Sequence, residues 1–191
     1  MQRTEAPAIA GDSAVFGALI DQHYAAVLRF LTRQTGDPEL AADLTQACFL
    51  DAYRARHQLA NQDAFAPWLF SIARNQVRME WRRQKVRRLV SLDWLASRAG
   101  DVIPALSRAD DTGPLHERDR IQQVLDDLSP TLREALLLHN LAGFRGSEVA
   151  DILGISPDAA RKRIVRAEAE FRQRYGSSLP PGQIEATTDA R

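Results

Sequence analysis

Basic side chains concentrate in residues 74–88, where their types and spacing suit contacts with nucleic acid. This stretch carries seven Arg or Lys side chains against a single acid. Arg74, Arg78 and Arg82 recur at every fourth position, so on a helix they form one stripe. Positive charge of this density binds the phosphates of a nucleic-acid backbone. The spacing therefore predicts a helix with a phosphate-binding face.

Aromatic residues Phe65, Trp68 and Trp81 lie in the same predicted element as the arginine stripe. Aromatic faces stack on unpaired bases, so this combination suits single-stranded or melting DNA better than duplex alone. Two plainer interpretations stay open. Phe65 and Trp68 also suit an ordinary hydrophobic core, and the arginines suit a solvated helix surface.

A second basic cluster belongs to a helix-turn-helix pattern that begins at Gly146. Gly154 supplies the tight turn, and Ala150 is small where two helices must cross closely. The outward face of the second helix carries four basic side chains: Arg161, Lys162, Arg163 and Arg166. Such a helix fits the major groove of DNA, with basic side chains on phosphates and guanines. The alternative is a helical hairpin with a solvated basic face.

Hydrophobic periodicity predicts that only helices position these side chains. The motif Gly36-Asp37-Pro38 indicates a helix end, an N-cap and a first-turn proline. The apolar spacing predicts one helix before this motif, starting near Ser13, and six after it: 38–56, 65–88, 117–128, 130–141, 146–153 and 157–175. The chain shows no strand pattern and no internal repeat. We therefore expect an all-α fold.

Glycine, proline and aspartate interrupt the helical pattern between the two basic clusters. The interruption predicts two small helical domains joined by a flexible linker. The predicted segments are a disordered tail at 1–12, a domain at 13–88, a linker at 89–116, a domain at 117–175 and a tail at 176–191. Such a linker lets the two domains bind well-separated sites.

Composition excludes several classes of protein. Lys+Arg and Asp+Glu both number 25 among 191 residues, so any nucleic-acid partner is indicated by the distribution of charge and not by its sum. A lone Cys48 and four scattered histidines predict no disulfide and no metal site. Without a signal-peptide pattern or a membrane-spanning run, we expect a cytoplasmic protein. Lacking a catalytic constellation, we expect no enzyme, no cofactor and no small-molecule substrate.

At these residues the chain resembles the extracytoplasmic-function sigma factors, the smallest group of the sigma-70 family. One matching block runs from Gly36 to Tyr53, and a second runs from Trp68 to Asn75 and ends at Arg82-Arg83. The third block is the helix-turn-helix together with the Leu128–Leu138 segment before it. The first two blocks lie before the predicted linker and the third lies after it. This order is more specific than any one motif.

The resemblance implies three binding surfaces, for core RNA polymerase and for the −10 and −35 elements of promoter DNA. Polymerase would be bound, through the clamp helices of its largest subunit and the flap of the second largest, by Asp43, Leu44, Gln46, Phe49 and Asp51. The −10 element would be bound by Asn61, Phe65, Trp68, Ile72, Arg74, Asn75, Arg78, Arg82 and Arg83. The −35 element would be bound by Arg145, Ser147, Ser156, Arg161, Lys162, Arg163 and Arg166.

The resemblance further implies an anti-sigma factor, often membrane-tethered, as a regulatory partner. Four positions depart from the family pattern, and they affect individual contacts: Ala47, Leu59, Met79 and Ala159. Two other classes of protein remain as alternatives. One is a stand-alone regulator that binds operator DNA through the C-terminal helix-turn-helix. The other is a helical interaction protein whose basic faces bind acidic partners.

Overall fold

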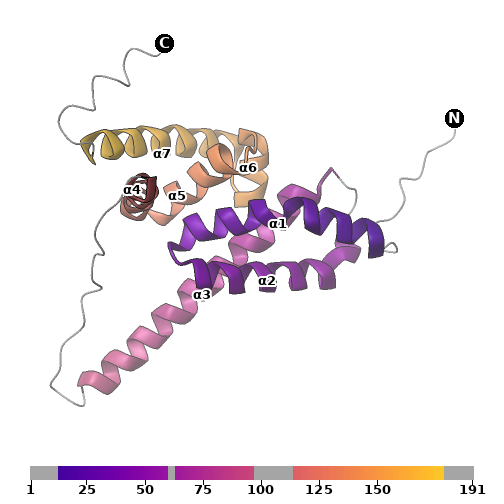
Figure 1. The fold of residues 1–191 in the computed structure, drawn as a ribbon, viewed down its shortest axis with the longest axis horizontal. Coiled ribbons are helices and arrows are strands. Elements are labelled where there is room, and N and C mark those ends of the chain that lie inside the picture. Colours follow the sequence, from indigo (N-terminus) through magenta and orange to yellow (C-terminus); the bar gives the residue numbers. More distant parts are fainter. Residues whose placement is uncertain (1–12, 60–62, 97–113, 179–191) are drawn as a thin grey trace, which may run out of the picture.

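The computed structural model describes residues 13–59, 63–96 and 114–178, and within these ranges it contains helices and turns but no strand (Figure 1). The all-α prediction is therefore confirmed. The principal helices are α1 (Ser13–Thr35), α2 (Pro38–Ala55), α3 (Phe65–Ala96), α4 (Pro114–Asp127), α5 (Pro130–Leu136), α6 (Gly146–Leu153) and α7 (Pro157–Ser178). A 3-10 turn, Arg56–Gln58, follows α2, and a π-helical segment, Leu137–Leu141, continues α5.

Three helix bounds differ from the sequence prediction. Helix α3 continues to Ala96, well past the predicted end at Arg88, because no glycine or proline interrupts the chain before Gly100. Helix α4 begins at Pro114 and α7 ends at Ser178, so both are longer than expected. The predicted tail 1–12, the last part of the C-terminal tail and the central part of the predicted linker lie outside the described residues.

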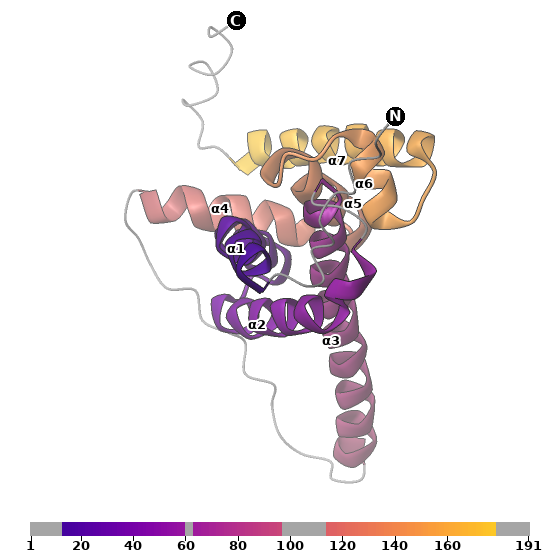
Figure 2. The same ribbon diagram turned by 90° about the vertical axis from the view of Figure 1, so that its right-hand side faces the viewer.

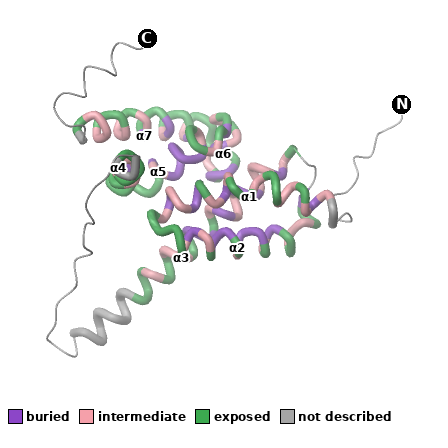
Figure 3. The backbone as a smooth tube through the Cα atoms, viewed as in Figure 1, coloured by how far each residue is buried: buried purple, intermediate pink, exposed green. Residues whose placement is uncertain are grey.

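Helices α1, α2 and α3 form an N-terminal domain. Gly36 adopts a φ of 70°, and Asp37 accepts hydrogen bonds from the backbone N–H groups of Glu39 and Leu40 at 2.9 and 3.0 Å. The stop, cap and restart predicted at this motif are thus present. The turn brings α2 back along α1, and buried side chains line the facing surfaces of the three helices (Figure 3).

Helices α4 to α7 form a C-terminal domain that contains the helix-turn-helix. Gly154 adopts a φ of 64°, and the Ile155 N–H donates to the Ala150 carbonyl at 3.0 Å, which closes the turn. Ala150 and Ala160 are buried, as expected where α6 and α7 cross. Ser129 precedes α5 as predicted, but its hydroxyl lies 3.4 Å from that of Thr131 and caps no backbone N–H.

The two domains pack directly against each other. Helix α1 lies between α2 and the C-terminal domain, while α3 extends along both (Figures 1 and 2). The ring of Phe70 in α3 meets the ring of Phe144, which precedes α6, edge-on with 4.9 Å between centroids. The prediction of two small helical domains is confirmed, and their direct packing, which the linker pattern did not predict, comes from contacts between side chains of the two domains.

Candidate polymerase and promoter-DNA interfaces

The helix-turn-helix presents the basic face of α7 to solvent. Ala160, Ile164 and Ala167 are buried on the inner face of α7, so residues on the opposite face of the helix point outward. Arg161 and Lys162 are exposed there. This geometry agrees with the predicted outward basic face, which has the shape to enter a DNA groove.

Local hydrogen bonds cap the N-termini of the two helices of the motif, α6 and α7. The Glu148 carboxylate accepts the Arg145 N–H at 2.7 Å, while the Ser156 hydroxyl accepts the Ala159 N–H at 3.2 Å. Ser156 therefore serves as an N-cap in addition to its predicted place at the DNA face. Arg145 and Ser147, two further predicted −35 residues, are exposed at the start of α6.

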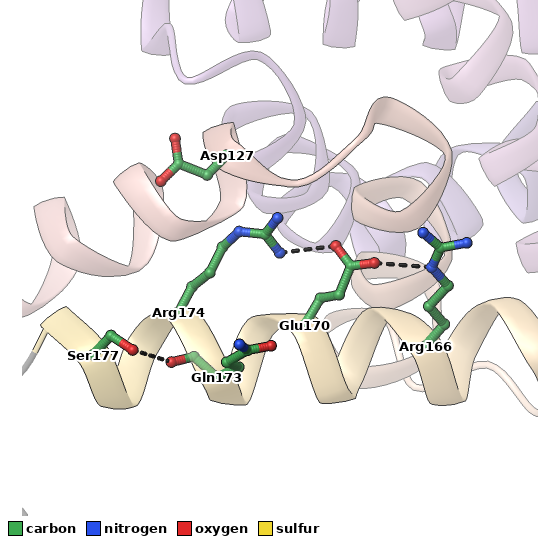
Figure 4. A pocket seen from close by; sticks show the side chains of 6 residues that line it. All are labelled: Asp127, Arg166, Glu170, Gln173, Arg174 and Ser177. Atoms are coloured by element: carbon green, nitrogen blue, oxygen red, sulfur yellow. Dashed lines mark hydrogen bonds and ion pairs between the residues drawn. The ribbon is translucent and has the colours of Figure 1, made fainter.

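Several basic side chains of α7 are already paired with acids on the same helix. Lys162 lies 2.9 Å from Asp158, and Glu170 receives hydrogen bonds from Arg166 and Arg174 (Figure 4). The bonds from Arg174 and Arg166 lower the pKa of Glu170. Exposed pairs of this kind contribute little to stability because water and salt screen them, so a DNA phosphate can replace the carboxylate.

A polar hollow of about 720 Å³ lies beside the Arg166–Glu170–Arg174 cluster (Figure 4). Asp127, from the end of α4, contributes an acid to its rim. Arg174 did not enter the sequence prediction. Its position four residues after Glu170 was the available signal, because helical residues at that spacing are neighbours.

The predicted −10 residues divide into buried and exposed groups along α3. Phe65 is fully buried against Phe16, which supports its core interpretation, whereas Trp68 and Ile72 are half-buried. Four polar residues of the set are exposed: Asn75, Arg78, Arg82 and Arg83. Asn61 lies outside the described residues. Helix α3 thus offers an exposed basic stripe beside partly accessible aromatic surface.

Arg74 is the exception in the arginine stripe, because the C-terminal domain covers it. Its Nε donates to Glu134 of α5 at 2.8 Å, and its Nη1 lies 3.4 Å from the Ile152 carbonyl of α6. The Arg74 side chain is only 14% exposed. A stripe expected to face solvent along its whole length is therefore interrupted at its first member by a contact that joins the domains.

Helix α2 carries the residues predicted to bind polymerase, but only some are accessible. Asp43 and Gln46 are exposed, whereas Leu44 and Phe49 are buried and hold the helix in place. Asp51 is half-buried and accepts a hydrogen bond of 2.7 Å from Gln76. The accessible part of the predicted set is thus polar.

An apolar hollow of about 440 Å³ adjoins these polar residues on α1 and α2. Its lining includes Tyr24, Leu50 and Tyr53, which are 42%, 57% and 45% exposed. The ring of Tyr24 stacks on that of Phe49 at the surface. Exposed apolar side chains gathered in one place mark a binding surface. The sequence prediction missed it because apolar residues at helical spacing ordinarily indicate core.

Comparison with known proteins identifies the family. The family model for Sigma-70 region 2 matches residues 19–87, and the family model for Sigma-70, region 4 matches residues 118–171. The chain is 35% identical to RNA polymerase sigma factor CarQ of Myxococcus xanthus over 166 residues, covering 87% of this chain and 92% of CarQ. The chain belongs to the sigma-70 family of RNA polymerase sigma factors. The resemblance to its extracytoplasmic-function group is confirmed.

Other sigma factors are similar to this one in sequence or in fold. ECF RNA polymerase sigma factor SigL of Mycobacterium tuberculosis is 29% identical over 160 residues, with 82% of this chain and 86% of SigL covered. A structure of RpoE with the anti-sigma factor NepR from Bartonella quintana shares the fold, with a TM-score of 0.69, 21% identity, and coverage of 86% and 99%. A structure of CnrH with the cytosolic domain of CnrY also shares the fold, with a TM-score of 0.67 and 24% identity. The match covers 90% of this chain and 94% of CnrH.

The described residues of the sigma factor contain neither a membrane-spanning helix nor a cluster of metal-ligating side chains. No described helix combines the length and the apolar character needed to cross a membrane. Among the same residues, no group of three or more His, Cys, Asp or Glu side chains is placed to hold a metal ion.

Proposed function

We propose that this sigma factor binds core RNA polymerase, directs it to promoters through their −35 and −10 elements, and promotes strand separation at the start site. The observation that carries the proposal is the presence of two exposed basic faces, on α3 and α7, in a chain that matches both DNA-binding regions of the family. Neither a stand-alone operator-binding regulator nor a general helical interaction protein accounts for both.

Helix α2 is the proposed docking surface for core polymerase. Asp43 and Gln46 supply polar contacts beside the apolar hollow of Tyr24, Leu50 and Tyr53. An apolar centre with a polar rim is the usual anatomy of a protein interface. We assign this surface to the clamp helices of the largest polymerase subunit, and the C-terminal domain to the flap of the second largest.

The DNA contacts divide into positioning and melting. Arg161, Lys162 and Arg163 of α7 hold the −35 duplex, where basic side chains read base edges and bind phosphates. Trp68 and Asn75 of α3 hold a −10 base out of the stack. Unstacking costs a few kcal/mol per base, and stacking on an aromatic ring returns about 1–3 kcal/mol. Differential affinity for separated strands thus shifts the equilibrium towards the open promoter.

The proposal includes an anti-sigma factor as regulator and the cytoplasm as the site of action. Two sigma factors of similar structure are in complex with a partner: RpoE with the anti-sigma factor NepR, and CnrH with the cytosolic domain of CnrY. We extend this to an anti-sigma factor, membrane-tethered or free, for the present chain. Its site of action is the cytoplasm, where polymerase and DNA are. The chain acts through binding and is not itself an enzyme.

In vitro transcription with purified core polymerase and a genomic DNA library, read by start-site sequencing, tests the proposal. We expect discrete start sites that require the sigma factor. Arg161→Ala should abolish promoter selection while core binding stays intact, and Arg172→Ala, the same change on an exposed face of the same helix, should have little effect. Equal transcription with and without the sigma factor would refute the proposed function.

A further inference from the structure

We propose that Glu134 latches the C-terminal domain onto the −10 face of α3, so that the free chain is closed and its −10 surface is inhibited until the domains separate. The inference rests on the proposed function of α3 as the −10 reader. It adds a regulatory contact inside the chain itself. The contact joins side chains that stand 60 positions apart in the sequence.

Glu134 occupies the place of an anion among arginines from both DNA-binding faces. Its carboxylate bonds to Arg74, and the charges of Arg78 and Arg163 also act on it. Burial raises the pKa of Glu134, while Arg74, Arg78 and Arg163 act in the opposite direction. Guanidinium groups bind carboxylates and phosphates with the same geometry. The carboxylate therefore occupies Arg74 in the way a DNA phosphate would.

Further contacts close the interface around this pair. Phe70 and Phe144 pack edge-on, and Arg33 of α1 donates to the Arg118 carbonyl and the Gln122 side chain of α4 at 3.1 and 3.3 Å. These contacts join the first and third helices to the C-terminal domain. The closed arrangement thus rests on several contacts, with the ion pair at Arg74 on the functional surface.

The same interface has features of one that opens. Arg133 donates to the Gln34 carbonyl at 3.0 Å, yet the buried atoms Gln34 Oε1 and Arg133 Nε have no hydrogen-bond partner among the described residues. Buried polar atoms without partners lower the stability of the state that contains them. A buried ion pair likewise contributes less than apolar packing of similar volume, because both charges lose water. The closed state is held but is not locked.

Promoter binding requires the domains to separate. The −35 and −10 elements are centred about 25 base pairs apart, or roughly 85 Å at 3.4 Å per pair. In the closed state Arg74 of the −10 face is within hydrogen-bonding distance of the C-terminal domain, and Arg163 of the −35 face acts on the same carboxylate. One domain cannot remain at this contact while each binds its own element.

The proposed polymerase surface stays accessible in the closed state. Helix α2 lies across α1 from the C-terminal domain in both views (Figures 1 and 2). Leu50 and Tyr53 of α2 remain exposed. Polymerase can therefore dock first on the closed chain, and the −10 face becomes available when the C-terminal domain moves to its own site. The latch would keep free sigma factor off DNA.

Fluorescence energy transfer in the full-length chain tests the latch. Donor and acceptor dyes are attached at Glu39→Cys in α2 and Gln173→Cys in α7, both at exposed positions, while the fully buried Cys48 does not label. We expect high transfer in the parent chain and lower transfer in Glu134→Gln, which removes the charge but keeps the shape. Glu170→Gln, whose arginine partners lie on its own helix, is the matched control and should retain high transfer.

Circular dichroism separates opening from unfolding. If Glu134→Gln fails to fold, Arg74→Gln breaks the same pair from the N-terminal domain and should also lower transfer. Low transfer in the parent chain, or unchanged transfer in the folded variants, overturns the latch. In-vitro transcription by the parent chain keeps this failure distinguishable from failure of the proposed function.

Binding of a fluorescein-labelled single-stranded oligonucleotide carrying the mapped −10 sequence supplies a second readout. Apparent affinity falls by the fraction of competent molecules, so a chain that is open one time in ten gains about tenfold on release. We expect Glu134→Gln to bind this oligonucleotide more tightly than the parent chain. Equal affinity, with lower transfer in the same variant, would show that opening does not uncover the −10 surface and would overturn the inhibitory role.

Discussion

The side-chain amide of Gln76 in α3 donates a 2.7 Å hydrogen bond to the carboxylate of Asp51 in α2. The bond joins the helix proposed to hold the −10 element to the helix proposed to bind polymerase. Gln76 is 7% exposed, so its amide has little access to water if the bond is lost. The two proposed binding surfaces of the N-terminal domain are thus connected by a partly buried polar contact.

Gln76→Ala should lower the free energy of unfolding by about 1–2 kcal/mol, because it removes the bond and leaves a small cavity. Urea titration followed by circular dichroism measures this. Gln123→Ala, at an exposed position of α4, should change the free energy by less than about 0.5 kcal/mol. Equal effects of the two changes would show that the Asp51 contact contributes nothing.

Gly154→Ala should destabilise the C-terminal domain by about 1–2 kcal/mol through backbone strain alone. Gly154 has a φ of 64°, a left-handed conformation that costs an L-residue about this much. A Cβ there meets nothing within 4 Å, so no steric clash contributes. Thermal unfolding measures the loss.

Gly146→Ala is the matched control for this turn. Gly146 begins α6, its added Cβ also meets nothing within 4 Å, and no positive φ is required. The change should be neutral or stabilising by up to about 1 kcal/mol, since alanine has less freedom in the unfolded chain. The same loss at both positions would contradict a conformational origin.

Cys48 should react slowly with thiol reagents in the folded chain. Burial, and secondarily the charge of Asp51, raises its pKa from 9.0 to about 12. At pH 9 we expect alkylation to be at least about 100-fold slower than in denaturing urea, because the thiolate is the reactive form. Mass spectrometry of iodoacetamide-treated protein measures the rate.

The same pKa predicts how stability varies with alkaline pH. The folded chain holds the proton more tightly than the unfolded one, so this contribution is complete below pH 9.0 and is lost as pH rises towards 12. Unfolding in urea at several pH values should show the decline in the parent chain and a smaller one in Cys48→Ala. Parallel curves for the two chains would argue against the raised pKa.

Leu50→Asp should weaken binding to core polymerase by about tenfold or more, because it places a charge in the centre of the proposed apolar contact. Leu50 is 57% exposed, so the fold should be unaffected. Val86→Asp makes a similar change at a position of α3 that is 59% exposed, and core affinity should be retained. Fluorescence anisotropy titration with core polymerase measures both.

Trp68→Ala combined with Asn75→Ala should impair promoter melting more than duplex binding. Loss of one stacking contact of about 1–3 kcal/mol reduces the open population about fivefold or more. Permanganate footprinting reports the unpaired thymines, with Gln84→Ala as a control on the same helix. Footprints of parental intensity in the double variant would exclude these residues from base capture.

Local sequence signals determined the secondary structure and the basic outer face of α7. The Gly36-Asp37-Pro38 motif, the Gly154 turn and the exposed side chains of Arg161 and Lys162 all appear as predicted. Each depends on residues within about a turn of one another, because capping, positive φ and helical periodicity are short-range effects. The polymerase, −10 and −35 assignments of individual residues remain predictions.

Tertiary structure alone decided which helical faces are covered. Tyr24 and Arg74 both fit their helical patterns, yet Tyr24 lies at the surface and Arg74 is enclosed by the C-terminal domain. The periodicity of one helix says that a face is apolar or basic, but not which distant segment packs on it. That choice comes from long-range complementarity such as Arg74 with Glu134 and Phe70 with Phe144, whose free energy depends on both domains being folded.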